Sequence, residues 1–423
     1  MRDNGALPPD LDRSVAVLIV KIGRYPLHHG GVAAIRTLGR LGVPVYAITE
    51  DRLTPAALSR YLRGRFVWPT TGGEDPEELV DGLLAIGRRL DGRVIALPTD
   101  DEAAVLLAEH AARLGERFEV SDGPPGLPRA LADKFTLHQL CLTHGVPSPV
   151  SERPASIDDL LGAAERIGYP VVLKNAEPWA RLRQPAVSST TVVGSEQELR
   201  ALTGRWTSMP RVLVQEYLPG GDGVVDWIVN VYCGTTAAIV PFTGVKVRSW
   251  PAGAGVTTRA YTRANEQLAE MTSSFCRDVG FRGIGDLDWR FDPVDGRYRL
   301  LDFNPRVGAQ FRLFETDSGI DVVRAMHLEV TGRPIPPGAQ VEGHGLRVEN
   351  LDIAASWAYR GQNAPIPGGR TELSWLAIDD PLPAVAAAVY SGRLAAGVLR
   401  RRLSRKEAVD DGVGVPVEEL PLG

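Results

Sequence analysis

The stretch Gly283–Arg306 reads GIGDLDWRFDPVDGRYRLLDFNPR, and it decides how we interpret the rest of the chain. Two short runs rich in apolar residues, Gly285–Phe291 and Arg297–Phe303, flank the five residues DPVDG, whose proline and glycine favour a tight reversal. The pattern predicts a β-hairpin. Because side chains alternate between the faces of a strand, one face should be apolar and the other acidic.

The acidic face of the predicted hairpin has the side chains of a cation site. With Phe291 opposite Arg297, this face carries Asp286, Asp288, Leu300, Asp302 and Asn304. Asp288 and Asp302 would then lie diagonally across the strand pair, near Asn304. Carboxylate and amide oxygens favour Mg²⁺ or Mn²⁺, which in nucleotide sites needs only a few protein ligands. A solvated acidic face is the alternative that the hairpin alone leaves open.

Composition restricts the class of protein. The 423 residues suffice for two or three domains, and 44% hydrophobic with 23% charged residues is typical of a soluble globular protein. A formal charge of -5 gives no general attraction to nucleic acid or anionic lipid. The three cysteines are far apart and fit buried thiols. Without a signal-like N-terminus or a run of ~18 apolar residues, we expect a cytoplasmic protein with no membrane contact.

The first 120 residues alternate between strand and helix patterns, which predicts an open parallel α/β sheet. The expected strands are Val15–Lys21, Val43–Thr49, Phe66–Pro69 and Val94–Pro98. The expected helices are Ala33–Leu41, Pro76–Leu90 and Glu102–Leu114. Such sheets bind ligands beyond the carboxyl ends of their strands. The loop Gly23–Gly31 lies at such an end, where helix amides and His28 could bind a substrate anion, but a plain surface turn is the preferred interpretation.

Two lysines occupy positions that suit an anion. Lys134 lies early in a helix predicted over Arg129–His144, and Lys174 ends the apolar strand Gly168–Lys174. A lysine at the end of a buried strand should meet a negative charge, because desolvating an unpaired ammonium group is costly. The polar loop Asn175–Ser189 then could cover phosphates. The next strand, Val212–Leu218, leads into the glycine-rich sequence PGGDG.

These features together resemble the ATP-grasp family, and within it the carboxylate-amine ligases of the D-aspartate ligase type. The resemblance extends from about Ala130 to Pro334 and rests on the order of Lys134, Lys174, the QEYL run at 215–218 and the DFNPR run at 302–306. It implies an α/β and α+β fold with three parts. These are an open parallel α/β domain (1–124), an ATP-grasp domain of two subdomains that clamp ATP (125–338) and a C-terminal extension (339–423).

The resemblance also implies site residues. Lys134 and Lys174 would hold the ATP phosphates, and Arg306 would act catalytically on the transferred phosphoryl group. The remaining implied nucleotide-binding residues are Gln215 and the Leu218 backbone for adenine, Glu216 between them, and Asp226 for the ribose. The implied Mg²⁺ (or Mn²⁺) ligands are Asp288, Asp302 and Asn304. Asp302 departs from the family, where the second metal carboxylate is commonly Glu.

Further cationic residues could face the substrate. Lys246 and Arg248 are two apart, so on a strand they would share one face, and Arg248 is our preferred catalytic or substrate-carboxylate ligand. A solvated strand face is the alternative. Arg312 is a third candidate, between aromatic residues that we expect in the core. The helical stretch Val385–Lys406 ends in basic residues and is read as a solvated helix end, or else as a membrane or partner surface.

The implied function is an ATP-dependent ligase that forms an amide or peptide bond through an acyl phosphate and releases ADP and phosphate. Its expected substrates are a small carboxylate and an amine, such as amino acids or peptides, and a homodimer is one possible assembly. Two alternatives stay open. One is an ATP-grasp carboxylase or kinase that uses bicarbonate or another oxygen nucleophile, and the other is a non-catalytic ATP-binding regulator.

Overall fold

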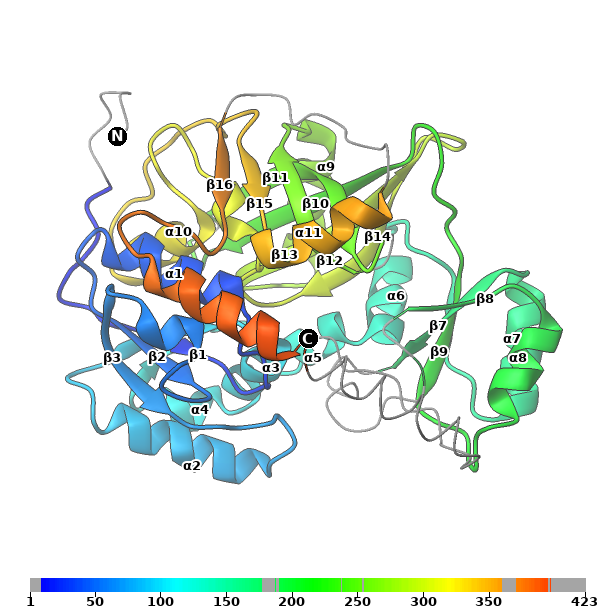
Figure 1. Ribbon diagram of the computed structural model, residues 1–423, viewed down its shortest axis with the longest axis horizontal. Helices are drawn as coiled ribbons and strands as arrows, with labels where there is room; N and C mark the ends of the chain where they lie inside the picture. The colour runs from blue at the N-terminus through cyan, green and yellow to red at the C-terminus, as the bar shows by residue number, and fades with distance from the viewer. Residues whose placement is uncertain are drawn as a thin grey trace.

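The computed structural model of the chain describes residues 9–176, 187, 190–236, 238–252, 255–359, 370–394 and 396. Figure 1 shows three β-sheets with helices packed against them. The N-terminal sheet lies beside the largest sheet, whereas the smallest sheet lies at the opposite end of the molecule (Figure 1). The expected mixture of α/β and α+β architecture is confirmed.

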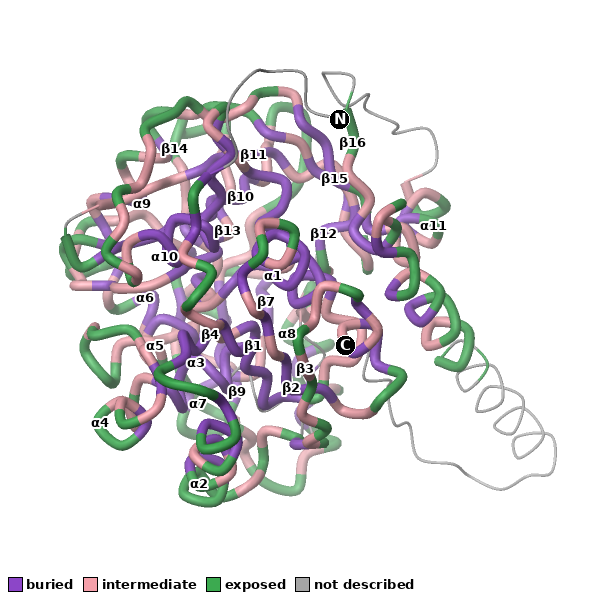
Figure 2. The backbone as a smooth tube through the Cα atoms, turned by 90° about the vertical axis from the view of Figure 1, so that its left-hand side faces the viewer, coloured by how far each residue is buried: buried purple, intermediate pink, exposed green. Residues whose placement is uncertain are grey.

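The N-terminal sheet consists of parallel strands in the order β3-β2-β1-β4-β5. The strands are β1 (Val17–Val20), β2 (Val45–Thr49), β3 (Leu62–Val67), β4 (Val94–Pro98) and β5 (Phe118–Glu119). The helices are α1 (His29–Gly39), η1 (Pro55–Leu58), α2 (Pro76–Gly87), α3 (Asp101–Glu109) and α4 (Ala111–Leu114). Val17 and Ile19 of β1 face one core and Leu18 and Val20 face another, so β1 is buried throughout (Figure 2). The predicted open parallel sheet is confirmed.

The helix predicted over Arg129–His144 is two helices, α5 (Leu127–Ala132) and α6 (Lys134–Thr143). Asp133 between them has an extended backbone, and its side chain caps α6 by accepting a hydrogen bond of 2.8 Å from the Thr136 amide. The prediction of one continuous helix was therefore wrong. The break makes Lys134 the first residue of α6.

The smallest sheet has four strands in the order β6-β9-β7-β8, and its pairs are antiparallel. The strands are β6 (Ser151–Glu152), β7 (Val171–Asn175), β8 (Thr191–Val193) and β9 (Val212–Glu216). Two helices, α7 (Ile157–Ile167) and α8 (Glu196–Thr203), pack with it around a common core. The loop predicted to cover phosphates, Asn175–Ser189, lies mostly outside the described residues.

The largest sheet has the strand order β14-β13-β10-β11-β12-β15-β16. Its strands are β10 (Val225–Cys233), β11 (Ile239–Trp250), β12 (Val256–Thr262), β13 (Gly283–Asp292), β14 (Arg297–Asn304), β15 (Gly345–Arg347) and β16 (Thr371–Leu373). The helices that accompany it are α9 (Glu266–Asp278), η3 (Phe311–Leu313), α10 (Val322–Val330) and α11 (Glu349–Ala358). Trp227 and Trp289 pack in a core with α9, whereas Ile228 packs in a core shared with β1. The N-terminal sheet and this sheet are thus joined by apolar packing.

The predicted hairpin exists as β13 and β14, but its register differs from the prediction. Asp292, not Phe291, pairs with Arg297, and Asp288 lies directly opposite Asp302. An irregularity after Asp288 leaves Leu301 without a partner, which shifts the alternation of β14 by one residue. Leu300 is consequently buried in the apolar core, where Leu301 was expected.

The region predicted as a C-terminal extension adds β15 and β16 to the largest sheet, followed by helical residues 382–394. The domain boundaries stay a prediction, and the basic residues 400–406 lie outside the described residues. Cys141, Cys233 and Cys276 are free and buried, as expected. In the described part of the chain, every helix is too short or too polar to cross a membrane.

Candidate active site

Two carboxylates from the hairpin form the centre of the site. Asp288 and Asp302 are directly opposite each other on β13 and β14. Ile228, which pairs with Asp288 on β10, belongs to the core shared with the N-terminal sheet, so the acidic face turns toward that sheet. The Nδ2 atom of Asn304 donates a 3.1 Å hydrogen bond to the Asp286 carbonyl, which leaves the Asn304 amide oxygen as a potential cation ligand.

Ammonium groups from different elements meet these carboxylates. Lys134, at the start of α6, forms an ion pair with Asp302, and Lys246 Nζ of β11 lies 2.7 Å from Asp288 Oδ1. Burial raises the pKa of Asp302, but the nearby Lys134 and Lys174 charges outweigh this effect and lower it below its usual value. The structure therefore brings Lys134 and Lys174 together with the predicted metal carboxylates.

Lys174 has a lowered pKa. Burial lowers its pKa to about 8, and the like charge of Lys134 acts in the same direction. The carboxylates of Asp302 and Asp288 partly oppose the change. A buried lysine of this kind should bind an anion well. A bound phosphate would stabilise the charged ammonium form of Lys174, which burial disfavours.

Arg306 lies beside the same face, where it contacts two buried carboxylates. Its Nη1 atom is 3.1 Å from Asp286 Oδ2, and its Nε atom is 3.4 Å from Asp101 Oδ1. Burial raises the pKa of Asp286 to about 6, although the Arg306 charge opposes the rise. Asp286, whose role the sequence left open, is thus a partner of Arg306, and Asp101 was not singled out by the sequence.

Arg290 is a further residue that sequence reasoning missed. Its guanidinium binds both oxygens of Asp226, at 2.7 and 3.0 Å, and donates a 2.7 Å hydrogen bond to the Leu218 carbonyl. Asp226 lies within β10 and pairs with Arg290 in the strand register. The spacing of two from Asp288 to Arg290 placed both on one face and could have indicated this contact.

Gln215 and Glu216, which we predicted to bind the nucleotide, are the last two residues of β9, next to β6. The Gln215 side chain is buried and donates a 2.8 Å hydrogen bond to Ser151 Oγ. The Glu216 amide donates to the Val150 carbonyl at 2.8 Å, and its carboxylate accepts from the Val150 amide at 3.1 Å. These contacts tie both side chains to the segment at 150–151, and their role toward a nucleotide stays a prediction.

Arg248 does not join the cluster. A bulge in β11 separates it from Lys246, so the expectation that both side chains share one face was wrong. Lys246 reaches Asp288, whereas Arg248 is buried and lies 3.3 Å from Asp352 of α11. The pairing of this guanidinium with Asp352 gives no support to the predicted contact with a substrate carboxylate.

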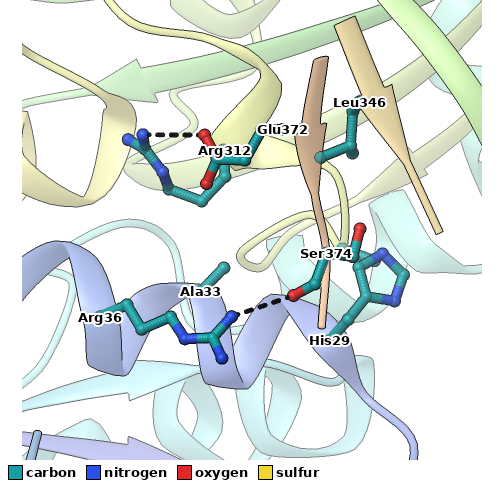
Figure 3. Close-up of a pocket in the computed structure, with 8 residues that line it drawn as sticks. His29, Ala33, Arg36, Arg312, Leu346, Glu372 and Ser374 are labelled. Carbon is teal, nitrogen blue, oxygen red and sulfur yellow. Dashed lines mark hydrogen bonds and ion pairs between the residues drawn. The ribbon is translucent and has the colours of Figure 1, made fainter. Parts of the chain in front are cut away.

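Arg312 and the loop around His28 also have structural partners. Arg312 is buried and binds Asp321 at 2.9 Å and Glu372 at 3.3 Å. It lines a small cavity together with His29, Ala33, Arg36, Ala309, Leu346, Glu372 and Ser374 (Figure 3). His28 caps α1, since its Nδ1 atom accepts a 3.0 Å hydrogen bond from the Gly31 amide. That amide is therefore not available to a substrate anion in this arrangement.

The donor set fits a hard divalent cation held mainly by a nucleotide. Among the described residues, no three His, Cys, Asp or Glu side chains gather closely enough to hold a metal alone. Asp288, Asp302 and Asn304 supply oxygen atoms only, and Mg²⁺ commonly takes one or two carboxylates plus phosphate and water. The assignment of these three residues as ligands stays a prediction.

No protein-family model matches the chain. D-aspartate ligase from Enterococcus faecium is 20% identical over 293 residues, which cover 66% of this chain and 68% of that protein. Biotin carboxylase from Allochromatium vinosum is 24% identical over 56% of this chain, and the match spans about half of that enzyme (55%).

Solved structures have the same fold. The N5-carboxyaminoimidazole synthetase of Staphylococcus aureus superposes with a TM-score of 0.60 at 13% identity, covering 86% of this chain and 92% of that one. The biotin carboxylase of Campylobacter jejuni gives a TM-score of 0.55 at 15% identity, covering 76% of this chain and 72% of that one, and was solved as a β-γ-ATP complex. The chain is similar in sequence and in fold to members of the ATP-grasp superfamily. Within that superfamily it is similar to the carboxylate-amine ligases, as the D-aspartate ligase match indicates.

Proposed function

We propose that this chain is an ATP-dependent carboxylate-amine ligase. A substrate carboxylate attacks the γ-phosphorus of ATP, which gives an acyl phosphate and ADP. An amine then attacks the acyl carbon, loses a proton and displaces phosphate, so that an amide bond forms. The protein forms no covalent bond in this scheme and acts by positioning and by neutralising charge.

The observation that carries this proposal is the convergence of Lys134, Lys174 and Lys246 on Asp288 and Asp302. Lysines of α6 and of the largest sheet pair with this acidic face, and the charge of Lys174, from the smallest sheet, interacts with the same two carboxylates. A triphosphate with Mg²⁺ would exchange these internal ion pairs for lysine–phosphate and carboxylate–metal contacts. When bound, the metal ion would supply additional neutralisation of the phosphates.

Arg306 is the proposed catalytic cation. It lies on the acidic face beside Asp286, and a guanidinium suits the charge that develops on a transferred phosphoryl group. Asp288, Asp302 and Asn304 are the proposed metal ligands, while Gln215, Glu216, Leu218 and Asp226 are the proposed contacts to the nucleoside. Arg248, buried against Asp352, is not retained as a substrate ligand in this proposal.

The relatives support two substrate classes. D-aspartate ligase favours an amino-acid substrate and amide formation. Biotin carboxylase and N5-carboxyaminoimidazole synthetase favour a carboxylase as the second candidate, and one related biotin carboxylase domain was solved with MgADP and bicarbonate.

The test is to incubate the protein with MgATP and pools of carboxylates and amino acids, and to measure ADP, AMP and phosphate. We expect ADP and phosphate in equal amounts, with coupled products seen by mass spectrometry. Asp302→Ala and Lys174→Ala should abolish turnover, whereas Asp295→Ala, in the exposed turn of the same hairpin, should not. AMP would reject the acyl-phosphate route, and ADP that depends on bicarbonate would favour the carboxylase. Absence of ADP with every pool would indicate a non-catalytic ATP-binding protein.

A further inference from the structure

The guanidinium of Arg306 is held by two separate parts of the chain. Asp286 belongs to β13 of the largest sheet, and Asp101 is the first residue of α3 in the N-terminal part. The contacts are 3.1 Å to Asp286 and 3.4 Å to Asp101, and both carboxylate side chains are 8% exposed. Two largely dehydrated carboxylates on one cation restrict the orientation of the planar group.

The backbone after Arg306 also docks on the N-terminal part. The Val307 amide donates a 3.2 Å hydrogen bond to the carbonyl of Pro98, the last residue of β4. A Cβ atom on Gly30 of α1 would lie 2.9 Å from the Ala309 Cα atom and 3.0 Å from the Gly308 carbonyl oxygen. The N-terminal part therefore contacts both the guanidinium and the loop that carries it.

Asp101 lies in the first turn of α3, where a negative charge is favourable, but it does not cap the helix. The neighbouring Asp100 caps α3 by accepting from the Ala103 amide at 2.7 Å, and it also binds the amides of Ile22 and Gly23. The Oδ1 atom of Asp101 is buried and accepts no hydrogen bond among the described residues, and it is the atom nearest Arg306. Burying a carboxylate without a structural hydrogen bond is costly, so its interaction with Arg306 is the contact that accounts for it.

We propose that Asp101 is a positioning residue, which orients the guanidinium of Arg306 from the N-terminal part of the chain. The active site is therefore complete only when the N-terminal part is docked on the largest sheet. This inference rests on the proposed function of Arg306. Asp101 acts through Arg306 and touches no reacting atom. Its neutralisation should leave nucleotide binding intact and slow the chemical step.

The test compares Asp101→Asn, which keeps the size of the side chain, with Asp101→Glu and with Glu109→Gln. Glu109 is on the same helix and its carboxylate binds Arg129 at 2.6 Å on the surface, so it is a matched control. We expect Asp101→Asn to lower kcat about 10- to 100-fold with the KM for ATP within about twofold, because a small misplacement of a catalytic group costs up to about 100-fold. Asp101→Glu should recover part of kcat, and the control should match the unmodified protein. A kcat of Asp101→Asn within about twofold of that protein would overturn the inference.

Hydrogen exchange separates this inference from the proposed function. Peptides that contain Val307 should exchange faster in Asp101→Asn than in the unmodified protein or in Glu109→Gln. The loop would lose the ion pair of Arg306 with Asp101 and keep the hydrogen bond of the Val307 amide to Pro98. Equal exchange in all three proteins would refute the positioning role. If the unmodified protein forms no ADP, the proposed function fails, and the exchange result still decides whether Asp101 holds the Arg306 loop.

Discussion

Raising the pH from 7 to 9 should weaken nucleotide binding, because Lys174 loses its charge in this range. Burial and the neighbouring Lys134 lower the pKa of Lys174 to about 8, which is below the ordinary value of a lysine. The ammonium form dominates below this pKa and the neutral amine dominates above it. The folded protein therefore presents a charged Lys174 to the phosphates at pH 7 and mostly a neutral one at pH 9.

The size of the effect follows from the pKa. One pH unit below it, about nine-tenths of the molecules carry the ammonium group, and one unit above it about one-tenth do. If only the charged form binds, the Kd for MgADP should rise about tenfold between pH 7 and pH 9. Binding at pH 8 to 9 should also take up a proton, since the bound phosphates raise the pKa of Lys174.

The assay is calorimetric titration of MgADP at pH 7, 8 and 9, in two buffers of different ionisation enthalpy. Lys174→Arg is the matched variant, because a guanidinium stays charged throughout this range and should give a nearly constant Kd. Glu102, whose pKa burial raises to about 9, titrates in the same window, and any slope that remains in Lys174→Arg measures such groups. Equal slopes in the two proteins would refute the assignment of the effect to Lys174.

Two other changes test the site and the fold. Arg290→Ala should raise the Kd for MgADP several-fold, because Asp226 loses its bidentate partner. Arg290→Lys should recover little of the affinity, since a lysine cannot bind both carboxylate oxygens in the same way. An unchanged Kd in Arg290→Ala would contradict this role. Trp289→Ala should reduce the free energy of unfolding by about 3–5 kcal/mol, because the indole is completely buried. Trp357→Ala, at a side chain that is 70% exposed, should change the midpoint of unfolding in guanidinium chloride only slightly. Similar midpoints for the two variants would count against the core assignment.

The alternation of apolar and polar residues predicted the elements of the fold well, because burial decides which face of a strand is apolar. It predicted the hairpin and the parallel N-terminal sheet, and β4 has the predicted bounds. It could not predict the extra residue at Leu301, since a bulge changes the face of a side chain without a glycine or proline to mark it. The break at Asp133 was also missed, although an aspartate before a helical run is a recognised capping signal.

Some of the residues that the sequence singled out lie close together in the structure. Lys134, Lys174, Asp288 and Asp302 are neighbours in space, although their roles toward a ligand are still predictions. The ion pair of Asp101 with Arg306 could not be seen, because it joins residues about 200 positions apart and depends on how two sheets pack. The same reason explains Arg248, whose partner Asp352 follows it by 104 residues.

The contacts of Arg36 have a consequence for the order in which the protein matures. This α1 residue is buried and donates hydrogen bonds to the Ser374 carbonyl, to the Trp375 carbonyl and to both the carbonyl and the carboxylate of Asp380. During synthesis the first helix therefore lacks these partners until residues 374–380 have left the ribosome. In a nascent chain stopped before residue 370, the Arg36 guanidinium would lack these partners, and the surface of α1 that they cover would be exposed. We expect such a chain to be a better substrate for chaperones and proteases than the folded protein.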